Sequence, residues 1–115
     1  MTADLNIIVE RFKKEAETDY IGLWEIIRAI KSVGKVTAEV ELRDHALLVV
    51  RAMLATGFIV GFPTSKRPGF HPWEDQNLAY VLQRIDNEWK ALGREPNIGD
   101  IVWFDLPVVP KTHRG

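Results

Sequence analysis

The sequence predicts a single α+β domain over residues 1–115, mostly helical, with four helices around a central apolar helix, a small β-hairpin and a C-terminal strand-like segment. Three observations support this prediction. One long run is almost entirely apolar, other segments repeat apolar residues at intervals of three and four, and two β-rich segments flank a loop of turn-forming residues. A chain of 115 residues, of which 46% are hydrophobic and 27% charged, can bury a core of its own.

The central helix of this prediction begins at Thr37 and ends before Gly57. Between Ala46 and Ala55 the only polar residue is Arg51, and there is no helix breaker. This composition is too apolar for a surface helix with one buried stripe. We therefore expect the helix to pack on more than one side and its neighbours to hide it from water. Thr37 is suited to cap its start, and Gly57 to end it.

Two helices are predicted before the central one. Apolar residues at intervals of three and four mark one face of residues 5–16, with Asp4 as the cap. A second face of this kind follows over residues 20–33, after a break at residues 18–19. Gly34 closes that helix.

A hairpin is predicted after the central helix. Residues 58–63 are rich in β-forming side chains, and residues 70–73 are suited to a short returning strand. The six residues between them have the composition of a loop, so that Lys66 and Arg67 fall at the tip.

The C-terminal part begins with the most regular amphipathic pattern of the chain. It predicts a helix over residues 76–92, with Asp75 as the cap and Gly93 at the end. Residues 100–106 then predict a strand or a packed extended segment. Two prolines follow, and we expect residues 107–115 to form a flexible tail.

The order of two helices and a hairpin resembles a winged-helix domain over residues 20–72. A winged helix usually has three helices before its wing, whereas this chain predicts one long helix at residues 37–57. The resemblance implies a DNA-binding regulator, with Lys66, Arg67 and Arg43 as candidate contacts. The segment EWKALGREPNIGDIVWF also looks like the end of small uncharacterised bacterial proteins, which carries no activity with it.

The charge balance disfavours nucleic acid as the main partner. The net charge is −1, and residues 18–72 hold seven Lys or Arg against five Asp or Glu. A surplus of two is small for binding through phosphates. The first half of the central helix also carries Glu39, Glu41 and Asp44, which phosphates repel. Residues 73–115 have the opposite balance, with five basic and seven acidic side chains, and this favours a basic partner.

No pattern in the sequence predicts catalysis, a metal site or a cofactor. The chain has no cysteine, and its three histidines lack the helical spacing of a zinc site. There is no glycine-rich phosphate loop and no serine with a base and an orienting group. The N-terminus lacks the form of a signal peptide, and no apolar run is long enough to span a bilayer. These features predict a cytoplasmic protein that is not an enzyme.

Aromatic residues near the C-terminus suggest how such a protein binds a partner. Side chains alternate along a strand, so one of Trp103 and Phe104 points inward and the other outward. An exposed ring beside Asp100 and Asp105 would anchor a protein partner. The alternative is that both rings pack over the core and the segment is a structural clasp.

The sequence therefore predicts a small bacterial interaction protein without catalytic activity, of the immunity or antitoxin kind. The alternative is the winged-helix-like DNA-binding regulator. A homodimer that buries part of the central helix is compatible with either function, because that helix is apolar nearly all round.

Overall fold

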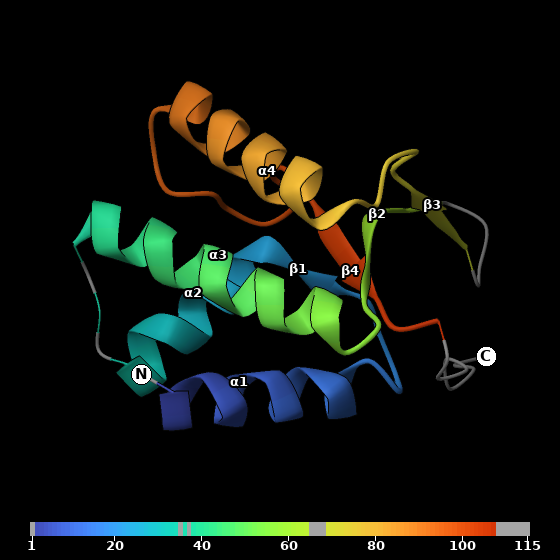
Figure 1. The fold of residues 1–115 in the computed structure, drawn as a ribbon, viewed down its shortest axis with the longest axis horizontal. Helices are drawn as coiled ribbons and strands as arrows, with labels where there is room; N and C mark the ends of the chain where they lie inside the picture. The colour runs from blue at the N-terminus through green and yellow to red at the C-terminus, as the bar shows by residue number, and fades with distance from the viewer. Residues whose placement is uncertain (1, 35, 37, 65–68, 108–115) are drawn as a thin grey trace.

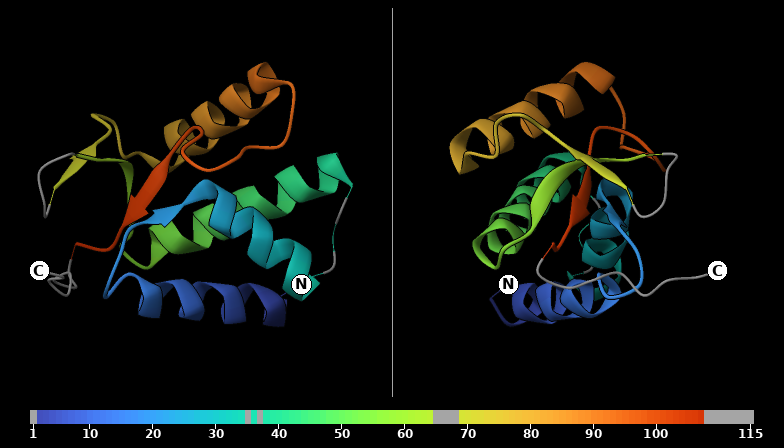
Figure 2. Two further views of the ribbon diagram at one scale, coloured as in Figure 1. Left: turned by 180° about the vertical axis from the view of Figure 1, so that it is seen from behind. Right: turned by 90° about the vertical axis from the view of Figure 1, so that its right-hand side faces the viewer.

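The computed structural model describes residues 2–34, 36, 38–64 and 69–107, with helix α3 (Glu39–Ala55) running through the middle. Figure 1 shows α1 (Thr2–Glu15) on one side of α3 and α4 (Leu78–Leu92) on the other. Part of a four-stranded antiparallel sheet and α2 (Leu23–Ala29) lie behind α3, and they come to the front when the molecule is seen from behind (Figure 2), while the rest of the sheet lies beside the end of α3. The predicted α+β class is confirmed.

The central helix packs on several sides, as its composition predicts. It contacts α1, α2 and α4. Its buried residues are Leu42, Ala46, Val49, Val50 and Met53. One side is nevertheless open to solvent, because Leu48 exposes 45% of its surface and Arg51 is also exposed. The expectation that neighbours hide the whole apolar run was therefore wrong for this side. The predicted cap, Thr37, lies outside the described residues.

The two N-terminal helices differ from the prediction at their starts. Helix α1 begins at Thr2, so Asp4 is a position inside the helix and not the N-cap position. The helix predicted over residues 20–33 begins later, because Ile21–Gly22 forms a short strand, β1, that pairs with the C-terminal strand. Helix α2 then passes directly into a π-helical turn, η1 (Ile30–Gly34), and the helical segment ends at Gly34 as predicted.

The sheet has the strand order β1-β4-β2-β3, and all its pairs are antiparallel. Its other strands are β2 (Ile59–Pro63), β3 (Phe70–Pro72) and β4 (Trp103–Asp105). Strands β2 and β3 form the predicted hairpin. Strand β4 is shorter than the predicted extended segment, residues 100–106, because Ile101 has a φ of 67°, a left-handed conformation that does not continue a strand. The remainder of the predicted tail, residues 108–115, lies outside the described residues.

Helix α4 starts two residues later than predicted and ends as predicted. Asn77 is its cap, and its side-chain oxygen accepts a hydrogen bond of 3.3 Å from the backbone N–H of Tyr80. Asp75, the predicted cap, instead accepts a bond of 2.8 Å from the backbone N–H of Asn77, so it orders the turn before the helix. Gly93 ends the helix with a φ of 73°, which favours glycine.

One core joins all these elements. Its largest fully buried side chains are those of Trp89, Phe12 and Phe104, from α4, α1 and β4. Among the helices of the described ranges, none combines the length and the apolar composition needed to cross a membrane.

Candidate functional site, an aromatic face of the sheet

The strand register divides the sheet into a buried face and a half-buried face. The row that points into the core, aligned across β1, β4 and β2, consists of Ile21, Phe104 and Val60. Each of these exposes at most 1% of its surface. The next aligned row consists of Gly22, Trp103 and Gly61. Because side chains alternate along a strand, the indole of Trp103 points away from the core.

One of the glycines beside Trp103, Gly22, gives aromatic rings room to lie on the backbone. A Cβ atom added to Gly22 would be 2.7 Å from the indole of Trp24 and 3.4 Å from the ring of Trp103, so both indoles lie close to this glycine. Nearby, the ring centroids of Tyr20 and Phe70 are 5.1 Å apart with their planes tilted by 34°, within the range of favourable aromatic pairs.

We call the following six residues the aromatic face: Tyr20, Trp24, Ile59, Pro63, Phe70 and Trp103. Ile59 and Pro63 belong to it because they alternate with the core residue Val60 and its neighbours along β2. All six are half-buried, so each keeps some surface for a further contact. The left panel of Figure 2 looks onto this side of the molecule, where β1 and β4 lie in front of α3.

The residues predicted to bind a partner lie in different environments in the structure. Trp103 and Asp105 share the aromatic side of the sheet, since Asp105 is aligned with Ile59 across β2 and β4. Phe104 exposes none of its surface and packs in the core, as the alternation requires for one of the two rings. A side chain without exposed surface cannot contact a partner, so Phe104 is removed from the candidate set.

Asp100 has a structural role in the turn before β4. Its carboxylate accepts a 2.8 Å bond from the backbone N–H of Asn97 and a 2.8 Å bond from Nη1 of Arg94. The Asn97 N–H, and then the Arg94 guanidinium, hold the pKa of Asp100 below its ordinary value. The carboxylate of Asp100 therefore stabilises the turn before β4. Asp105 is the carboxylate on the same side of the sheet as the aromatic face.

A cation also lies at the edge of the aromatic face. The guanidinium carbon of Arg28 is 5.3 Å from the ring centroid of Trp24, a cation–π distance. Arg28 therefore covers part of the Trp24 indole from the side of α2. Trp103, with the Asp105 carboxylate two residues along the same strand, is the ring that combines a half-buried indole with a nearby negative charge.

The residues predicted for nucleic-acid binding do not gather at this face. Lys66 and Arg67 lie outside the described residues. Arg43 is on the other side of the molecule, where its Nε lies 3.1 Å from Oδ1 of Asp86, an ion pair without hydrogen-bond alignment. Asp86 also pairs with Lys90 at 2.9 Å. Arg43 and Lys90 thus share the single carboxylate of Asp86, which holds the Arg43 side chain against α4.

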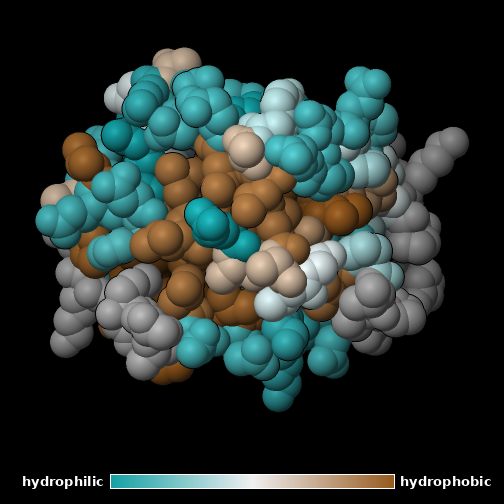
Figure 3. Space-filling view, in the orientation of Figure 1, coloured by the Kyte–Doolittle hydropathy of each residue, from teal (hydrophilic) through white to brown (hydrophobic). Residues whose placement is uncertain are grey.

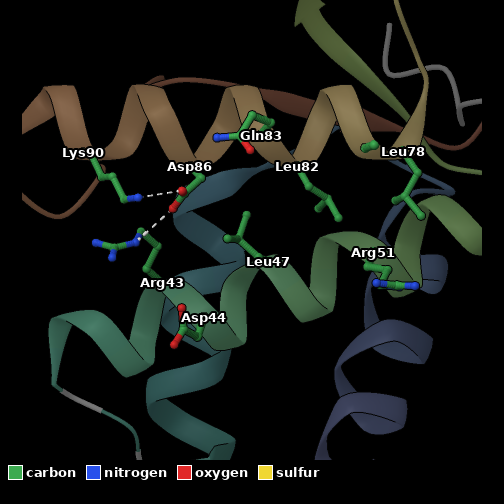
Figure 4. A pocket seen from close by; sticks show the side chains of 10 residues that line it. Arg43, Asp44, Leu47, Arg51, Leu78, Leu82, Gln83, Asp86 and Lys90 are labelled. Carbon is green, nitrogen blue, oxygen red and sulfur yellow. Dashed lines mark ion pairs between the residues drawn. The ribbon is translucent and has the colours of Figure 1, made fainter.

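The same side carries an open groove between α3 and α4 that the sequence did not predict. It encloses about 540 Å³. Figure 4 shows Leu47, Leu78 and Leu82 along it, with Arg51 at one end and the Arg43–Asp86–Lys90 ion pairs at the other. In the sequence, Arg51 was the residue that could have located this groove. It is the one charge in the apolar run, so the side of the helix that carries it had to face solvent.

The first turn of α2, beside the aromatic face, contains one carboxylate with a shifted pKa. Burial, with smaller contributions from Glu15 and Asp19, raises the pKa of Glu25 above its ordinary 4.5, and a 2.8 Å bond from the Gly22 backbone N–H opposes the shift. The folded chain thus holds this proton more tightly than the unfolded chain. The stability that Glu25 contributes is therefore greatest at low pH and falls as pH rises from 4.5 through the raised pKa.

We expect Glu25→Gln to remove this pH dependence. Glutamine keeps an oxygen that accepts the bond from Gly22 and has no charge to desolvate. The free energy of unfolding of the variant should rise relative to that of the wild type between pH 4 and 7, as followed by urea denaturation. A difference between the two that stays constant over this range would show that Glu25 has an ordinary pKa. Glu25→Ala, which also loses the acceptor, should be about 0.5–2 kcal/mol less stable than Glu25→Gln at any pH.

In the described part of the chain, no three His, Asp or Glu side chains come together at metal-binding distance.

Comparison with known protein families finds no family model that matches the chain, and comparisons with curated proteins and with solved structures also find no match. The candidate site is therefore assigned only from the positions and exposure of its residues in this structure.

Proposed function

We propose that this chain is a non-catalytic module that binds another protein through its aromatic face, with Trp103 as the central anchor. The observation that supports the proposal is the row of Trp103 between two glycines, which leaves a half-buried indole on the outer side of the sheet. Tryptophan is among the residues that dominate the free energy of protein interfaces.

The charge near Trp103 favours a partner with a basic surface. Asp105 lies on the same side of the sheet, and the C-terminal part of the chain is acidic on balance. A lysine or arginine of the partner would stack on the exposed indole and be attracted by this carboxylate. An immunity or antitoxin protein meets such a surface when it covers an enzyme that acts on nucleic acid, so this is the class of function we propose.

The proposal is tested by protein capture with matched variants. We expect the wild-type chain to retain a basic protein from an extract of its source organism and Trp103→Ala to bind it at least about 30-fold more weakly, the effect of losing an interface anchor. Ile98→Ala is the control, because Ile98 is 70% exposed and lies in the turn after α4, outside the aromatic face. Equal retention by a folded Trp103→Ala variant would show that the indole is not the anchor.

The winged-helix-like DNA-binding regulator is the alternative. The observation that favours it is the β2–β3 hairpin, whose connection contains Lys66 and Arg67. Titration with random duplex DNA separates the two functions. A regulator would bind with an affinity that falls steeply with salt and that decreases in the Lys66→Ala/Arg67→Ala variant.

A further inference from the structure

We propose that the open side of α3 binds the same side of a second copy of this chain, in antiparallel orientation about a two-fold axis between Leu47 and Leu48. This interface lies on the side opposite to the aromatic face, so it goes beyond the proposed function and does not depend on it. That the partner is a second copy is inferred from the order of the charged residues and leucines along the helix.

The interface is a stripe of exposed residues on consecutive turns of α3. This α3 stripe consists of Val40, Asp44, Leu48, Arg51 and Ala55. Val40 exposes 60% of its surface and Leu48 45%, and the neighbouring Leu78 of α4 exposes 37%. Exposed apolar side chains gathered on one side of a protein commonly mark an interaction surface. Figure 3 shows the apolar area over α3 in the orientation of Figure 1.

The stripe is symmetric about its centre. Asp44 and Arg51 are equally far from the midpoint between Leu47 and Leu48, roughly 5 Å along the helix axis on either side. Val40 and Ala55 are also equally far from that midpoint. A half-turn that reverses the helix therefore places Asp44 against Arg51 of the second copy, and Arg51 against its Asp44. An interface between identical chains requires this kind of self-complementarity.

The charges select the antiparallel orientation. In a parallel pair with the same register, Asp44 would face Asp44 and Arg51 would face Arg51, and both contacts repel. In the antiparallel pair the same four charges form two attractive contacts. Within the described residues neither Asp44 nor Arg51 has an ion-pair partner in its own chain, so both charges are available for a second copy.

The leucines at the centre fit the groove between α3 and α4. The half-turn places Leu48 of one copy against Leu47 of the other, and Leu47 lies in the groove with Leu78 and Leu82. Each copy thus contributes one exposed leucine and offers one groove with leucines along it and charged side chains at both ends. Burial of these leucines supplies the driving force, and the two Asp–Arg contacts fix the register.

Sedimentation equilibrium of the full chain tests the interface. We expect the wild type to form a dimer at tens of micromolar. Asp44→Arg places arginine against Arg51 at both ends of the interface, so the dissociation constant should rise at least about tenfold. In the double variant Asp44→Arg/Arg51→Asp the two contacts form again with exchanged charges, and the dimer should return. Glu74→Arg, which changes an exposed carboxylate outside the stripe, should leave the dimer intact.

Three results would overturn the proposal. The first is a wild-type chain that stays monomeric over this concentration range. The second is a dimer that survives Leu48→Asp, and the third is a double variant that remains as weak as Asp44→Arg alone. All substituted side chains are exposed, so circular dichroism should show unchanged helix content for each variant. Failure here leaves the capture experiment with Trp103→Ala unaffected, because Trp103 is on the opposite side.

Discussion

Replacing Gly61 by alanine should be among the most destabilising single substitutions in this chain. A Cβ atom at this position would lie 2.2 Å from the carbonyl oxygen of His71 and 2.6 Å from Cα of Pro72, and both are backbone atoms. Backbone cannot rotate away as a long side chain can, so β2 and β3 would have to separate. We expect a loss of at least about 2–3 kcal/mol in the free energy of unfolding, measured by urea denaturation.

Gly93→Ala is the matched control for this substitution. Gly93 has a φ of 73° and no atom within 4 Å of an added Cβ, so alanine there meets conformational strain without crowding. That strain should cost about 1–2 kcal/mol. The conformation of Gly61 is ordinary for any residue, and its cost arises from space alone. A Gly61→Ala variant that is no more destabilised than Gly93→Ala would contradict the close approach of β2 and β3.

Phe104→Ala should produce the largest loss of stability, about 3–5 kcal/mol. The ring exposes none of its surface and lies on β4 between Ile21 and Val60, so its removal leaves a cavity at the centre of the sheet. A domain of this size is usually stable by only about 5–15 kcal/mol, so the variant should be close to unfolding at room temperature.

The neighbouring substitution Trp103→Ala tests whether the two rings lie on opposite sides of β4. Its ring is half-buried on the outer side, so thermal or urea denaturation should show a clearly smaller loss than for Phe104→Ala. Phe104→Leu, which keeps most of the buried volume, should lose less than about 1.5 kcal/mol. Equal losses for Phe104→Ala and Trp103→Ala would contradict the placement of one ring inside and the other outside.

The elements that local periodicity controls were predictable from the sequence. The amphipathic repeat of α4 gave its extent to within two residues, and the turn-forming residues before Phe70 located the hairpin. Gly57 and Gly93 marked the ends of two helices, because few other residues adopt their φ of 108° and 73°. Each of these signals lies within a few residues of the structure that it specifies.

The parts that depend on distant pairing were not predictable. Strand β1 consists of Ile21 and Gly22 alone, and it exists because Phe104 and Trp103 pair with it from the other end of the chain. Two residues carry no periodic signal of their own, so they were assigned to the following helix. The aromatic face depends on this pairing, since it places Gly22 beside Trp103.

The open side of α3 was missed for a different reason. Val40 and Leu48 are the same types of residue as the core residues of that helix, so composition cannot tell an uncovered apolar stripe from a buried one. Only the positions of α1 and α4 decide which side remains open. The charged residues Asp44 and Arg51, which are exposed on this side, were the signals in the sequence that could have located it.

The aromatic face and the α3 stripe lie on opposite sides of the molecule, which has a consequence for avidity. A dimer formed through α3 would carry two outward-facing binding sites, joined rigidly through its helices. A partner that is itself dimeric, or that repeats its basic segment, would meet the second site at a high effective concentration once the first was occupied. Weak binding at each single site would then be enough for tight binding of the whole assembly.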